Sequence, residues 1–223
     1  MRTFAFMLTI VIVAAVFGTT AVFAQSSGSF SASYGPTSCA ISASDGTLSG
    51  GIGTQNGGTA KTSLPDVTVK VSAGNGVALV ITPSFVTGLY TNNKLSYNGG
   101  NTPSSTQNVG LRMKVTVDGV TTNVIPEMGG PGVIYDQRFM QVTASFLSGL
   151  TTCVDCFTLV QSTLAAHSFN FYVSNLAPGT HTISVSWDLV GGTSGEAACV
   201  GPGTLTVEQV KSFSFSSGVN LFF

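Results

Sequence analysis

The sequence predicts an all-β protein, an antiparallel β-sandwich of the jelly-roll or immunoglobulin-like type that follows an N-terminal signal peptide. Several segments alternate apolar and polar residues, which is typical of strands with one buried face. Turn-forming residues recur about every 8–12 residues, the spacing expected of sandwiches. No long helical periodicity is present. Together, these observations favour two layers of antiparallel strands over any helical fold.

The first 24 residues have the three-part layout of a secretory signal peptide. Arg2 is the only charge, an apolar run extends from Phe4 to about Phe17, and Val22 and Ala24 supply small residues before Gln25. An uncleaved anchor helix would need about 20 apolar residues, and this run is shorter. We therefore expect a signal peptide at 1–24, a Gly/Ser/Thr-rich segment at 25–62, and a single sandwich domain at 63–223.

The composition narrows the range of partners. The chain has 8 basic and 9 acidic residues, a net charge of −1, and only 8% charged residues, against about 25% in a typical soluble domain. No basic patch is present, so nucleic acid and anionic membranes are not expected partners. We expect a secreted or cell-surface protein with no membrane span after signal cleavage, whose partners are glycans, other surface proteins or further copies of itself.

The elements are expected in the following order. Segment 25–62 is expected to be loosely ordered, with one short strand around Cys39–Ile41 and with Cys39 attaching it to the domain. Asp118-Gly119 is expected to be a hairpin turn after which 120–125 returns along the preceding strand. Segment 157–166 could form a short helix or an irregular strand. The clearest strands are 67–71, 77–82, 109–117, 133–136, 138–147, 168–173, 181–189 and 204–210.

The four cysteines favour disulfides. Cys153 and Cys156 form a C-x-x-C pair, but a redox pair needs a helix N-terminus after a strand, and the surroundings here are all β. A zinc site with Cys199 and His167 has no common spacing. An even cysteine count in an exported chain fits two bridges. Three pairings stay open, with a weak preference for Cys153–Cys156 and Cys39–Cys199, because the small loop needs no exact strand register.

The sequence contains no recognised catalytic motif. We expect no enzyme activity, no cofactor and no metal site, and we interpret His167 and His181 as structural. The remaining alternative of this class is a secreted glycan hydrolase, which would need two facing carboxylates. Glu127, Asp136 and Glu196 could converge at one end of the fold for such a role.

The fold class suggests a structural or binding module, with glycans as the ligand class that an extracellular sandwich most readily serves. Sugar binding usually involves an exposed aromatic ring. The candidates for that ring are Tyr90, Tyr97 and Tyr135.

The C-terminal residues alternate apolar side chains on one face. They could form the last strand of the sandwich, or they could pair with the sheet edge of another copy, which would make the protein a self-assembling surface subunit. They also resemble the closing strand of bacterial outer-membrane barrels, which implies a small outer-membrane β-barrel as a further alternative. The residues of this assembly strand are Phe213, Phe215, Val219, Leu221 and Phe223.

Overall fold

The computed structural model is all-β, and all of its strand pairings are antiparallel. It describes residues 28–51, 53–56, 62–73, 77–98, 102–149, 152–191 and 195–211. Within these ranges the only helical element is a short 3₁₀ helix, η1 (Ser145–Gly149). The predicted all-β class is therefore confirmed.

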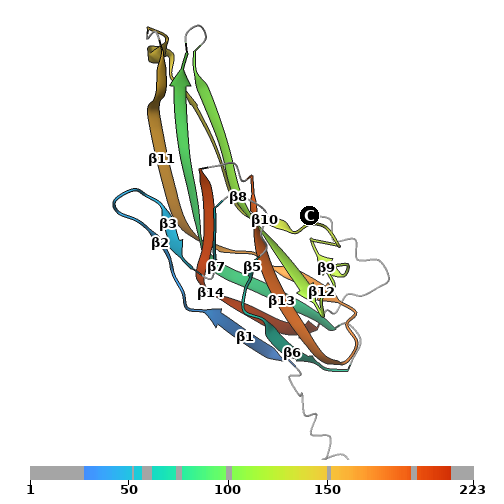
Figure 1. Ribbon diagram of the computed structural model, residues 1–223. Coiled ribbons are helices and arrows are strands. Elements are labelled where there is room, and N and C mark those ends of the chain that lie inside the picture. The colour runs from blue at the N-terminus through green and yellow to red at the C-terminus, as the bar shows by residue number, and fades with distance from the viewer. Residues whose placement is uncertain are drawn as a thin grey trace, which may run out of the picture.

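Two antiparallel sheets and a small hairpin contain all the strands of the described residues (Figure 1). The larger sheet has the order β1 (Phe30–Gly35), β14 (Glu196–Lys211), β7 (Val77–Tyr97), β12 (Phe171–Ser174) and β9 (Val124–Ile125), with β11 (Cys153–Ser168) also on β7 and β4 (Gly53–Asn56) on β14. The smaller sheet has the order β10 (Val133–Thr143), β8 (Ser104–Val117), β13 (Gly179–Val190) and β5 (Thr62–Ser63), with β6 (Val67–Val71) also on β13. The hairpin consists of β2 (Cys39–Ile41) and β3 (Leu48–Gly50).

The inner faces of the two sheets share one hydrophobic core. Met113 and Val115 of β8 and Trp187 of β13 meet Leu79 and Ile81 of β7 in a single cluster of buried side chains. The predicted alternation is confirmed where β6, β8 and β13 line the core, because every second residue of 67–71, 109–117 and 183–189 is buried. Burial of this apolar surface is the main favourable term for holding the sheets together.

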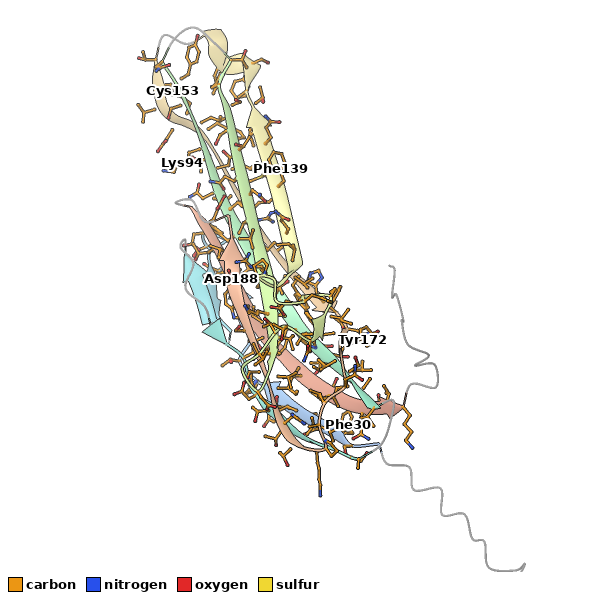
Figure 2. The ribbon with its side chains drawn as sticks, turned by 90° about the vertical axis from the view of Figure 1, so that its right-hand side faces the viewer. Phe30, Lys94, Phe139, Cys153, Tyr172 and Asp188 are labelled. Atoms are coloured by element: carbon orange, nitrogen blue, oxygen red, sulfur yellow. A yellow bond between two sulfur atoms is a disulfide. The ribbon has the colours of Figure 1, made fainter. Side chains whose placement is uncertain are left out.

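Strands β7, β11, β8 and β10 continue beyond this core as a narrow extension, which we call the arm (Figure 1). It comprises residues 89–97 of β7 paired with 153–163 of β11, and residues 104–108 of β8 paired with 139–143 of β10. Helix η1 lies at its far end, and Cys153 and Phe139 mark it in Figure 2. We call the remainder of the molecule the body.

The inside of the arm is polar. Thr91 and Asn93 are fully buried there, and Gln107 Nε2 donates to the backbone oxygen of Asn92 at 2.8 Å. The guanidinium of Arg138 donates to Gln161 O at 2.9 Å and to Thr91 Oγ1 at 3.2 Å. Hydrogen bonds rather than a large apolar core therefore hold the two layers of the arm together. A small apolar cluster closes its far end, formed by Leu95, Tyr97, Ala144 and Leu147.

The expected hairpin after residue 117 is only half correct. Asp118 and Gly119 form the turn, both with positive φ, but the chain returns along β8 for only the single bridge between Val117 and Val120. The positions beside β8 are occupied by β13 and β10. The expected return strand is therefore wrong, because β9 pairs instead with β12 in the larger sheet.

Two other segments are more ordered than expected. The short strand at Cys39–Ile41 is confirmed, but β1, β3 and β4 also form within segment 25–62, and β1 is a full edge strand on β14. Segment 157–166 is part of strand β11, not a helix. The expected strand at 77–82 is the first third of β7, which runs for 21 residues through Pro83 and Gly88.

Candidate functional site

A break in the strand ladder beside Pro83 creates a pocket on the outer face of the larger sheet. Pairing of β11 with β7 ends at Ser168, and pairing of β12 begins only at Phe171. Proline has no backbone N–H to donate, so an interrupted ladder at Pro83 leaves no donor of that residue unpaired. Phe169 and Asn170 consequently leave the strand.

The pocket has a volume of about 350 Å³. One wall comes from the break between β11 and β12, one from β12 itself, and one from β9, the neighbour of β12. Its lining combines aromatic, aliphatic and amide side chains. These are Ile125, Pro126, Phe169, Asn170 and Tyr172.

The register of β12 points Tyr172 outward. Phe171 and Val173 are fully buried in the core, and successive side chains of a strand point to opposite faces, so Tyr172 lies on the outer face (Figure 2). Ile125 is its direct partner on β9. Phe169 meets the buried Phe171 edge-to-face, with ring centroids 5.2 Å apart. This contact holds the ring of Phe169 in place at the pocket.

Asn170 supplies the polar group of the pocket. Its Oδ1 accepts a hydrogen bond from Thr82 Oγ1 at 2.8 Å, which orients the amide and leaves Nδ2 as the group that can donate to a ligand. A pocket of aromatic surface with a few oriented polar groups is typical of small-molecule sites. A sugar ring can stack its C–H face on such rings while its hydroxyls bond to the amide.

The three tyrosines expected to bind sugar lie elsewhere. Tyr97 is buried in the apolar cluster at the end of the arm. Tyr90 packs against Cys39, Leu48 and Cys199 beneath the β2–β3 hairpin. Neither ring stands free on the surface, and neither lines the pocket.

Tyr135 is buried between the sheets. Its hydroxyl accepts from Phe85 N at 3.2 Å and lies within hydrogen-bond distance of Pro83 O at 2.9 Å and His167 O. Burial raises the pKa of Tyr135 to about 12, so the hydroxyl keeps the proton that it donates to a carbonyl. This tyrosine holds β10 against β7 and is not an exposed ring.

The two disulfides confirm the preferred pairing. Cys39 is bonded to Cys199, which joins the β2–β3 hairpin to β14, and Cys153 is bonded to Cys156 near the end of the arm. All four cysteines are therefore used, and none remains to ligate zinc with His167. Within the described ranges, no group of three or more His, Cys, Asp or Glu residues is placed to hold a metal ion.

The three candidate carboxylates have separate partners. Glu127 is buried and accepts from Val115 N at 3.0 Å. Glu196 is also buried and accepts from Asn108 N at 3.0 Å. Asp136 lies in a third environment, beside β7. Each carboxylate accepts hydrogen bonds from donors on a neighbouring strand, and the three do not line a common cleft.

Asp136 lies between a hydroxyl and an imidazole. Its Oδ2 accepts from Thr87 Oγ1 at 2.6 Å and lies 3.3 Å from His167 Nε2. In a nucleophilic triad the histidine must lie between the hydroxyl and the carboxylate to remove the proton. Here the carboxylate is in the middle and Thr87 is fully buried, so this arrangement does not activate the hydroxyl.

His181 lies in a different environment, at the turn beside β13. Its Nδ1 is 2.7 Å from Asp118 Oδ2 and its Nε2 is 2.8 Å from Ala177 O. Asp118 also accepts from Thr182 N at 2.8 Å. These hydrogen bonds of His181 and Asp118 join the Asp118-Gly119 turn to β13.

The end of the arm exposes a second apolar surface, separate from the pocket. Phe146 of η1 is 70% exposed, and Val154, inside the small disulfide loop, is 86% exposed. The neighbouring acid Asp155 is paired with Lys94 at 2.9 Å. Phe146 lies at the far end of the arm and does not line the pocket, so its ring provides a position for a control substitution.

The sequence patterns do not identify the pocket. The strand expected at 168–173 begins only at Phe171, and Phe169 lies outside it and is 37% exposed. The available signal was Pro83, because proline in a central strand requires a local interruption of the ladder. The assembly strand at 213–223 and the signal peptide at 1–24 lie outside the described residues.

Within the described part of the chain, the structure contains no helix with the length and hydrophobicity needed to cross a lipid bilayer. A comparison with models of known protein families finds no match to this chain, and a comparison with curated proteins finds none either.

Proposed function

We propose that the protein is an exported, non-catalytic β-sandwich of the jelly-roll or immunoglobulin-like type that acts as an extracellular or cell-surface module and binds carbohydrate. The observation that carries this proposal is the pocket formed by Phe169, Asn170 and Tyr172 at the break in the ladder. Two disulfides and a low content of charged residues support export, because disulfides persist in oxidising compartments.

The chemistry of the pocket favours sugars over other small ligands. Its lining has no charged side chain among the described residues, so it offers no ionic contact to phosphates or peptides with charged groups. The two rings offer stacking surface, and the Asn170 amide offers a hydrogen-bond donor. Because the Tyr172 hydroxyl has no hydrogen-bond partner in the described chain, it too is available to sugar hydroxyls.

The proposal is tested by screening the purified protein on a glycan array and measuring the affinity of the best ligand by calorimetry. Tyr172→Ala should weaken binding about tenfold or more, which corresponds to about 1.4 kcal/mol. Phe146→Ala removes a more exposed ring at the end of the arm and should leave the affinity unchanged. Absence of binding to any glycan, or equal loss in both variants, would contradict carbohydrate recognition at this pocket.

The proposed absence of catalysis is tested with the same ligands. Fluorescently labelled oligosaccharides should remain intact during long incubation with the protein. Turnover that is lost in Glu127→Gln or Asp136→Asn would instead identify a hydrolase.

A second candidate function is self-assembly. The observation that favours it is the outer edge of β10, which among the described residues pairs only with β8 and carries the exposed Phe139. An exposed strand edge can accept a strand from another copy. Native mass spectrometry of the full chain and of a variant ending at Lys211 would test this role. Oligomers that disappear on truncation would place assembly first.

A further inference from the structure

We propose that the pocket is one end of a longer surface that binds a neutral oligosaccharide chain along β7. This inference rests on the proposed carbohydrate binding. It adds the direction in which the oligosaccharide lies on the protein, the charge of the oligosaccharide and its minimum length. Three observations support it: a second hollow, a line of polar side chains along the two hollows, and the absence of Lys, Arg, Asp and Glu from their linings among the described residues.

The second hollow has a volume of about 300 Å³ and lies further along the seam between β7 and β11. Ser84 and Ser168 form part of its lining, and Ser84 Oγ donates to Ser168 Oγ at 3.0 Å. Pro202 of β14 contributes another side. The two hollows are formed by different residues of the same sheet region.

The register places both hollows on one face. Leu79, Ile81 and Phe85 of β7 are buried in the core, so the residues between them, including Thr82 and Ser84, point outward. Tyr172 is opposite Val80, and Ser168 is opposite Ser84. At about 3.3 Å per residue, the four-residue step between these rows spans roughly 13 Å. A single sugar ring does not cover that length, but a short chain does.

Polar side chains connect the two hollows. The pair Thr82–Asn170 lies in the row between Tyr172 and the serines, and the pair Ser84–Ser168 follows it. Both hydrogen bonds are solvent-exposed, so these groups can exchange or share partners with sugar hydroxyls without a large desolvation cost. The line thus offers one amide and three hydroxyl groups to a chain of hydroxylated rings.

The scarcity of charged side chains on this surface favours a neutral oligosaccharide. Neither hollow is lined by Lys, Arg, Asp or Glu among the described residues. His167 borders the second hollow, with its Nε2 3.3 Å from Asp136 Oδ2. Glu208 is exposed and lies opposite Val80 on β14, one strand away. An anionic polymer would gain no ionic contact here and would meet this carboxylate.

The experiment measures affinity by calorimetry against two neutral series, cello-oligosaccharides and chito-oligosaccharides, from the disaccharide to the hexasaccharide. In the series that binds, the hexasaccharide should bind roughly tenfold more tightly than the disaccharide, because it reaches the second hollow. Ser168→Tyr fills that hollow without adding charge. It should abolish the gain with length while leaving the disaccharide affinity unchanged, and that unchanged affinity also shows that the variant folds.

A matched control tests the direction in which the oligosaccharide extends from the pocket. Ser174→Tyr places the same new ring on the outer face of β12, on the opposite side of Tyr172, and should leave the hexasaccharide affinity unchanged. Affinity that is independent of length, or a Ser168→Tyr variant that keeps the full gain, would overturn the extended surface while the pocket proposal stands. A wild-type protein that binds no member of either series, and no glycan on the array, would overturn both.

Discussion

Tyr172 has a proposed role in binding, whereas Tyr135 has a structural role in the fold. Tyr172 projects from β12 with its hydroxyl free of partners in the described chain, whereas the Tyr135 hydroxyl joins β10 to the backbone of Pro83 and Phe85. A buried hydroxyl that satisfies backbone groups stabilises the fold, because removing it leaves those groups unpaired. Substitution of Tyr172 is therefore expected to lower glycan affinity, whereas substitution of Tyr135 is expected to lower stability.

Tyr135→Phe tests this division. The change removes only the hydroxyl, which is the acceptor for Phe85 N and a donor to Pro83 O. Pro83 O keeps a hydrogen bond from Phe169 N at 3.4 Å. The free energy of unfolding should fall by about 1–3 kcal/mol, measured by urea denaturation, while glycan affinity stays the same. An affinity loss in a variant of unchanged stability would assign Tyr135 to ligand binding after all.

The His181 group makes stability depend on pH. Both ring nitrogens face acceptors, Ala177 O and Asp118 Oδ2, and only the protonated ring can donate to both. These bonds, first to Ala177 and then to Asp118, raise the pKa of His181. The pKa of Asp118 is lowered, mainly because it accepts from Thr182 N and then because of His181.

A histidine whose pKa is raised by folding stabilises the folded state fully at pH values below its pKa in the unfolded chain, which is about 6.5. This stabilisation is lost as the pH rises through the pKa of the histidine in the folded state. The wild-type protein should therefore lose stability between about pH 6 and pH 8, and His181→Gln should show a flatter profile in that window. Urea denaturation at both pH values measures the difference. A wild-type profile that rises across this window would show that the sign is wrong.

At the scale of elements, sequence patterns predicted strands with one apolar and one polar face, but not strands in polar surroundings. Strands β6, β8 and β13 alternate clearly because their inner residues are aliphatic. The arm portions of β7 and β11 do not, because their inward neighbours are Thr91, Asn93 and Arg138. Hydrophobic periodicity therefore could not locate the ends of β7 or distinguish β11 from a helix.

The pocket was not predictable from the same patterns for a related reason. Its position depends on the pairing of β7 with two different strands on one side, β11 and then β12. Such a switch is a property of long-range topology. The sequence marks it only by Pro83, whose role becomes clear once its neighbours are known.

The two disulfides should differ in their effect on stability. Cys39–Cys199 spans 160 residues and fastens the β2–β3 hairpin to β14, whereas Cys153–Cys156 spans three. A bridge restricts the unfolded chain more when it closes a longer loop. Replacing Cys39 and Cys199 by alanine should lower the free energy of unfolding by about 2–5 kcal/mol, measured by urea denaturation.

The matched control is replacement of Cys153 and Cys156 by alanine, which should have a much smaller global effect because the loop they close is short. Equal destabilisation by the two double variants would show that loop length does not govern the contribution of these bridges.

At the scale of the whole molecule, the body and the arm are stabilised by different forces. The body has a continuous apolar core between its sheets, while the arm relies on interior hydrogen bonds and a small apolar cluster at its end. Local opening is easier where few apolar contacts must be broken. The arm should therefore open without unfolding the body.

Hydrogen exchange measured by mass spectrometry tests this difference. Peptides from 153–163 and 138–143 should exchange faster than peptides from β8 residues 109–117 and from β13. Uniform protection along β7, from the body to the end of the arm, would show that the molecule opens as one unit.

The most direct test of carbohydrate binding is an NMR titration of the isotopically labelled protein with its best-binding oligosaccharide. We expect the largest shift changes at the Asn170 side-chain amide and the Phe169 and Tyr172 backbone amides, with Phe146 and the end of the arm unchanged. Shift changes confined to the arm, or absent at saturating sugar, would contradict the pocket as the binding site.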